Sequence, residues 1–130
     1  MDTGVTDEQI QQVAATARPL SMVQLRWAPD RRQDGADAIE LEHQRRMVSL
    51  RADGVIAVLC PVLSDTVAGV AVLALAVDEA RELMAHDPCV QAGMMTVEVL
   101  PCLGFPGDAI PPEIDTPRRR DGEVGRLGPR

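Results

Sequence analysis

The chain has 130 residues, of which 45% are hydrophobic and 25% charged, and this length and balance predict one globular domain. Its formal net charge of −7 repels phosphate backbones and only Trp27 and Phe105 could stack on bases, so we do not expect a nucleic-acid partner. The absence of lysine and tyrosine excludes a Schiff-base lysine and a phenolic acid, which leaves proton transfer to histidine, carboxylate or cysteine.

The first stretch predicts a short helix. Thr6 begins the sequence TDEQ, whose threonine and glutamine can cap a helix start reciprocally, and Ile10 and Val13 follow on one face until Pro19. The residues before this helix are acidic and polar, unlike a secretory signal. We therefore expect an N-terminal helical extension over residues 1–18 and a cytoplasmic protein.

The next stretches change from a strand pattern to a helix pattern. Residues 20–27 alternate loosely and end at the turn-rich sequence APDRRQDG, which predicts a first strand. From Asp37 to Asp53 the apolar residues recur with a helical period, and Gly54 follows as a left-handed stop. The inward face of this helix would carry Ala36, Ile39, His43, Met47 and Leu50, whereas Glu40, Glu42, Arg45, Arg46 and Arg51 would lie on its flanks or outside.

Two apolar runs, residues 55–63 and 67–77, predict a hairpin of two central strands. Pro61 cannot donate a ladder hydrogen bond, so it should lie at a bulge or on an unpaired edge. The longer run is about half of the roughly 20 apolar residues that cross a bilayer, so we do not expect a membrane protein. Asp78 then caps a second helix, and residues 94–101 alternate like a last strand that stops at its proline.

The order of elements over residues 19–101 is strand, helix, strand, strand, helix, strand. This βαββαβ order predicts a ferredoxin-like α+β fold, in which a four-stranded antiparallel sheet carries two helices on one face. The other face would be bare and apolar, so we expect two sheets to pack face to face in a homodimer. Residues 102–130 are interrupted by prolines and glycines, which predicts an extended or disordered tail.

The three cysteines, Cys60, Cys89 and Cys102, do not have the spacing of metal ligands and cannot all pair. We expect reduced thiols, no metal site and no cofactor. A thiol nucleophile would need an activating cation nearby, and none lies in register with Cys60 or Cys89. Inert buried thiols are therefore the expectation.

Four stretches of the domain together resemble a known sequence pattern. They are the helical histidine in LEHQRRMVSLRADG, the strand GVIAVLCPVL, the helix end DEARELMAHDP and the final DPCVQAGMMTVEVLP. With them, residues 20–101 resemble the YCII-related (YciI-like) family of dimeric α+β barrel proteins, although Cys60-Pro61 stands where members usually carry Gly-Pro. The resemblance implies a dimeric barrel, elimination or isomerisation of small cyclic compounds, and a histidine–aspartate pair in a cleft, here His43 and Asp87.

His43 and Asp87 also have ordinary structural interpretations. A histidine on an apolar helix face usually serves packing and needs a partner for at least one nitrogen. Asp87 before Pro88, with Gly93 behind them, could simply cap a helical turn. The topology nevertheless lays the two helices side by side, so the carboxylate could hold one imidazole nitrogen and raise the basicity of the other. His86, at a helix end, would more simply offset the helix dipole at the surface.

Two hypotheses on function remain. The first is a cofactor-independent lyase or isomerase in which His43 abstracts a proton, Asp87 orients it, and the ligand is a compact apolar or cyclic small molecule. Its pocket would be lined by methionines and by residues of the first strand, namely Ser21, Met22, Arg26, Trp27, Met47 and Met94. The second is a non-catalytic ligand-binding or protein-interaction module on the same dimeric barrel, favoured by the scarcity of other polar catalytic groups. A solvent-reachable imidazole would support the enzyme, and one sealed by Ile39 and Met47 would support a structural role.

Overall fold

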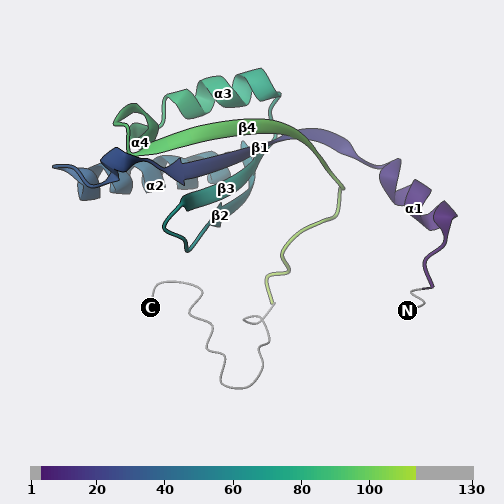
Figure 1. Cartoon of the computed structure of the whole chain (residues 1–130). Coiled ribbons are helices and arrows are strands. Elements are labelled where there is room, and N and C mark those ends of the chain that lie inside the picture. Colours follow the sequence, from purple (N-terminus) through teal and green to yellow (C-terminus); the bar gives the residue numbers. More distant parts are fainter. Residues whose placement is uncertain (1–3, 114–130) are drawn as a thin grey trace.

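A computed structural model describes residues 4–113 and shows an α+β domain (Figure 1). A four-stranded antiparallel sheet is combined with several helices. In chain order the elements are α1 (Asp7–Ala14), β1 (Arg18–Trp27), the 3₁₀ helix η1 (Pro29–Arg31), α2 (Ala36–Ala52), β2 (Ile56–Pro61), β3 (Val67–Leu73), α3 (Val77–Ala85), α4 (Pro88–Gln91) and β4 (Met95–Gly104). This architecture is compatible with the predicted ferredoxin-like fold.

The sheet has the strand order β2-β3-β1-β4, and every neighbouring pair is antiparallel. The prediction that both strands of the hairpin are central is wrong for β2, which forms one edge. Pro61 closes this edge strand, as expected for a residue that cannot donate to a ladder. The strands β1 and β3 occupy the centre, where apolar β-branched side chains pack between neighbours.

Helices α2 and α3 share one hydrophobic core with the sheet. Val23 and Leu25 of β1 and Leu73 of β3 are buried together with Met47 of α2 and Met84 of α3. On β1, buried residues alternate with half-buried ones, as the period of a strand with one covered face requires. The inward face predicted for α2 is therefore confirmed for its apolar residues, since Ala36, Ile39 and Leu50 also pack against this core.

The opposite face of the sheet carries apolar side chains on all four strands, together with the polar Gln24 of β1 and Glu98 of β4. Met22 of β1 lies between Val72 of β3 and Leu100 of β4, and these side chains alternate with the ones buried under the helices. Leu100 is 42% exposed and Val58 of β2 is 38% exposed. Apolar side chains thus form an open face, which we define by Met22, Val58, Val70, Val72 and Leu100.

The last strand is longer than the sequence pattern predicts. We expected it to stop at Pro101, but β4 continues to Gly104 and pairs with the start of β1, where Arg18 faces Gly104. Because β4 is an edge strand, the missing amide of Pro101 need not interrupt the ladder with β1. The remaining residues of the predicted tail from 114 onward lie outside the described part of the chain.

Helix α1 begins as predicted, because Thr6 and Gln9 form a complete capping box. The helix ends at Ala14, before Pro19 is reached, and it lies away from the sheet, beyond the start of β1 (Figure 1). None of its residues is buried, so Ile10 and Val13 present an apolar surface to solvent. Among residues 4–113, no helix has both the length and the apolar character of a membrane span.

Candidate active site

Asp87 is placed by the turn between α3 and α4. Its backbone is extended, and its side-chain Oδ2 accepts a hydrogen bond from the backbone N–H of Cys89 at 3.0 Å, so it caps α4. Pro88 occupies the first turn of α4. Gly93 follows the C-cap of this helix and has a positive φ of 76°. The structural interpretation of the Asp-Pro pair is thus confirmed, and it also fixes the direction of the carboxylate.

His43 reaches this carboxylate from the middle of α2. Its Nδ1 lies 2.8 Å from both Oδ1 and Oδ2 of Asp87. The Asp87 side chain is fully buried, whereas the imidazole is 13% exposed. The two helices are brought together because α2 and α4 pack against each other beside the core. The close approach that the topology predicts is therefore present in the structure.

The contact assigns roles to the two ring nitrogens. Carboxylate oxygens accept hydrogen bonds, so Nδ1 of His43 carries a hydrogen and donates a hydrogen bond to Asp87. Nε2 has no hydrogen-bond partner among the described residues. In the same residues, a single side-chain nitrogen or oxygen is both buried and without a partner, and it belongs to Arg46, not to His43. Nε2 of His43 is therefore not sealed from solvent.

Arg46 is a member of this cluster that the sequence analysis missed, because it placed this residue on the flank or outside of α2. Its Nη2 donates a hydrogen bond of 2.6 Å to the backbone carbonyl of Leu83. Its Nη1 is buried and lies 3.7 Å from Oδ1 of Asp87. The sequence does contain a signal for Arg46, because it follows His43 by three positions on α2. Residues three positions apart are neighbours on a helix surface.

Cys89 lies beside the same carboxylate. Burial, with the charges of Asp87 and Glu40 nearby, raises the pKa of this thiol from 9.0 to about 12. The donor atoms of His43, Asp87 and Cys89 lie within 4.8 Å of one another, a separation that a metal site could use. Here Nδ1 of His43 and the N–H of Cys89 already donate hydrogen bonds to the carboxylate, and the guanidinium of Arg46 lies beside it. This adjacent positive charge repels a cation, so the geometry favours the hydrogen-bonded cluster over a metal ion.

The residues expected to bind substrate fall into two groups. Ser21, Met47 and Met94 are fully or almost fully buried, and the Ser21 hydroxyl donates to the carbonyl of Leu75 at 2.6 Å. Their burial does not match the expectation that they line a cleft, because they pack inside the domain. Arg26 is exposed near the end of β1, and Trp27 is half-buried under the guanidinium of Arg31, 3.7 Å from its ring centroid.

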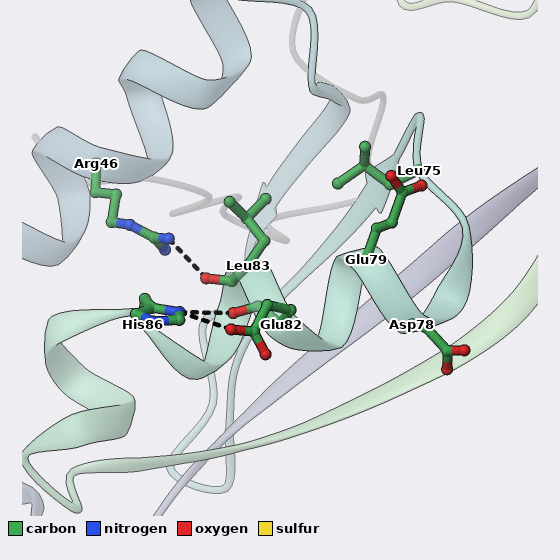
Figure 2. Close-up of a pocket in the computed structure, with 7 residues that line it drawn as sticks. All are labelled: Arg46, Leu75, Asp78, Glu79, Glu82, Leu83 and His86. Atoms are coloured by element: carbon green, nitrogen blue, oxygen red, sulfur yellow. Dashed lines mark hydrogen bonds and ion pairs between the residues drawn. The ribbon is translucent and has the colours of Figure 1, made fainter.

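A shallow pocket of about 550 Å³ lies between α2 and α3. It is lined by Arg46, Leu75, Asp78, Glu79, Glu82, Leu83 and His86. Figure 2 shows the Arg46 guanidinium directed at the Leu83 carbonyl and His86 turned toward Glu82. Nδ1 of His86 is 2.8 Å from the carbonyl oxygen of Glu82, and the side chain is 62% exposed, which agrees with a surface role at the end of α3. The pocket therefore meets the His43–Asp87 pair through Arg46.

The sequence was compared with known proteins in two ways. A scan against protein-family models finds no match, and no curated protein matches the chain. Inferences on function therefore depend on the site itself and on the resemblance noted in the sequence.

Proposed function

We propose that the protein is a small-molecule enzyme of the lyase or isomerase type that transfers a proton without a cofactor. The observation that carries this proposal is the distance of 2.8 Å from Nδ1 of His43 to both carboxylate oxygens of Asp87. A carboxylate in this position fixes the tautomer and orientation of the imidazole and increases the basicity of its other nitrogen. Such an oriented base contributes about 10²- to 10⁴-fold to a proton-transfer rate.

In the proposed reaction, Nε2 of His43 removes a proton from an acidic carbon of the substrate, and the C–H electron pair remains on the substrate. Asp87 stabilises the imidazolium that forms. Return of the same proton to a different carbon gives an isomerisation. Departure of a leaving group, with the proton delivered to it, gives an elimination and regenerates the neutral imidazole. Both outcomes leave His43 and Asp87 in their starting states.

The proposed substrate is a compact apolar or cyclic molecule. The resemblance to the YCII-related family supports small cyclic compounds. The pocket beside Arg46 has the apolar side chains of Leu75 and Leu83 in its lining and acidic groups on α3. Acidic groups repel anionic ligands, which favours a substrate without negative charge.

We also propose that the protein works as a homodimer formed through the open face of the sheet. Val72 and Leu100 lie next to Met22 on this face, and side chains of this size and polarity are stabilised by burial. A two-fold axis would set each open face against its copy, so that one surface serves both partners. Helices α2 and α3 would then lie on the outer side of the dimer, away from the interface, and His43 would lie in this helical layer.

A non-catalytic ligand-binding or protein-interaction module is the alternative. The surface of α1 favours it, because Ile10 and Val13 are each more than half exposed and have no core beneath them. In this case the His43–Asp87 pair would only join α2 to α4. The two proposals differ in whether any carbon acid exchanges its proton in the presence of the protein.

The experiment that tests the enzyme proposal uses a panel of five- and six-membered unsaturated lactones and cyclic ketones in D₂O. Deuterium incorporation at carbon and formation of isomers or elimination products are followed by NMR with and without the protein. Exchange or conversion above the buffer rate for a member of the panel supports the enzyme. Binding of members of the panel with no exchange in any of them supports the non-catalytic module.

A further inference from the structure

The buried carboxylate of Asp87 has several hydrogen-bonding or charged neighbours. It accepts hydrogen bonds from Nδ1 of His43 and from the backbone N–H of Cys89, and Nη1 of Arg46 lies 3.7 Å from its Oδ1. A fully buried carboxylate without a counter-charge is strongly destabilising. Either the imidazole or the guanidinium must therefore provide the charge that balances Asp87.

A second contact fixes the position of the Arg46 guanidinium beside Asp87. Its Nη2 donates to the Leu83 carbonyl at the C-terminal end of α3, where helix carbonyls carry partial negative charge. This bond leaves Nη1 buried beside Asp87, without a hydrogen-bond partner of its own among the described residues. The guanidinium has separate N–H groups, so one nitrogen can bond to Leu83 while the other faces Asp87.

We propose that Arg46 is a positioning residue of the candidate site, which holds the Asp87 carboxylate against His43 and balances its charge so that the imidazole can remain neutral. This inference rests on the proposed function, because only a neutral imidazole has a lone pair on Nε2 that can take a proton. With Arg46 absent, the buried carboxylate would favour the doubly protonated imidazole.

The other charged groups around His43 do not replace Arg46. On α2, Glu40 is negative and would add to the charge of Asp87, and on α4 the thiol of Cys89 keeps its proton. Strand β2, which also packs against α2, contributes only the exposed Cys60 as a titratable group. Arg45 is adjacent in sequence, but it is 66% exposed and its Nε lies 3.5 Å from Glu42. Arg45 is therefore a matched control for Arg46.

The test is ¹⁵N NMR of the imidazoles at pH 7 in the full chain. The protein has two histidines, so the His43 signals are identified by their loss in His43→Gln. In Arg46→Gln, whose amide can still bond to Leu83 but has no charge, the His43 signals should move toward the doubly protonated pattern. The ratio of charged to neutral imidazole should rise about tenfold, the usual effect of removing an adjacent charge. Arg45→Gln should leave the pattern of the parent protein.

Two further variants keep the inference testable. Arg46→Lys retains the positive charge and should keep the His43 pattern close to that of the parent. A folded Arg46→Gln protein with the parent's pattern, or an equal change in Arg46→Lys, overturns the inference. If Arg46→Gln does not fold, the double variant Arg46→Gln/Asp87→Asn should restore folding, since no buried charge is left unpaired, and failure to restore it also overturns the inference. None of these readouts needs a substrate, so they are independent of the test for catalysis.

Discussion

Nδ1 of His43 and the carboxylate of Asp87 lie 2.8 Å apart although 44 positions separate them in the chain. The distance results from two local structures, the inward face of α2 and the N-cap of α4, which the fold brings together. One carboxylate thus both begins a helix and holds an imidazole. These two uses can be separated by substitution, because asparagine caps helices as well as aspartate does.

Replacement of Asp87 should cost stability in two measurable steps. Asp87→Ala removes the cap and leaves Arg46 without its buried counter-charge, so we expect a loss of about 3 to 5 kcal/mol in the free energy of unfolding. Asp87→Asn retains the cap and should lose about 1 kcal/mol less than the alanine variant. Urea unfolding followed by circular dichroism measures both values. Equal losses in the two variants would show that the cap contributes nothing at this position.

The thiol of Cys89 should make the protein sensitive to alkaline pH. Its pKa is raised from 9.0 to about 12 by burial, so the folded state keeps a proton that the unfolded state releases. The stability that this proton provides is complete below pH 9 and is lost as the pH rises toward 12. The chain has no lysine or tyrosine to titrate in this range, which makes the effect easy to observe.

The measurement is urea unfolding of the parent protein and of Cys89→Ala at pH 8 and pH 10.5, under reducing conditions. The parent should lose more stability between the two pH values than the variant does. Cys60→Ala is the control, because Cys60 is exposed and should leave the pH dependence of the parent. Parallel behaviour of the parent and Cys89→Ala would contradict the assignment of a protonated buried thiol.

The proposed dimer depends on the centre of the open face. Val72 lies between Met22 of β1 and Val58 of β2, so a glutamate at this position would place a charge in the middle of the interface. We expect Val72→Glu to have the mass of one chain in light scattering, where the parent has the mass of two. Val48→Glu makes the same change on the exposed surface of α2 and should remain dimeric. A monomeric parent protein would contradict the proposed dimer.

The main elements could be predicted from the sequence because their signals are local. Thr6 with Gln9 begins α1 and Gly54, with a φ of 79°, follows the end of α2, and both signals depend only on neighbouring residues. The continuation of β4 through Pro101 could not be predicted, because it depends on this strand lying at an edge of the sheet. Edge position is a property of the complete topology.

The site was predictable in part for the same reason. The approach of His43 to Asp87 follows from the order of elements, with support from the resemblance. The burial of Met47 and Met94 could not be predicted, since a methionine near a site has the same pattern whether it lines a cleft or fills a core. Arg46 was missed because arginine is usually solvated, and its long side chain can turn inward to a buried charge without changing the helical pattern.

If His43 acts as the base, the rate of deuterium exchange into an accepted cyclic carbon acid depends on its imidazole, and two variants of α2 measure this dependence. His43→Gln should lower this rate by about 10²- to 10⁴-fold, the contribution of an oriented base, while its circular dichroism spectrum stays that of the parent. Arg45→Gln changes an exposed side chain of the same helix outside the pocket lining and should exchange at the parent's rate. A folded His43→Gln protein that exchanges as fast as the parent would contradict the claim.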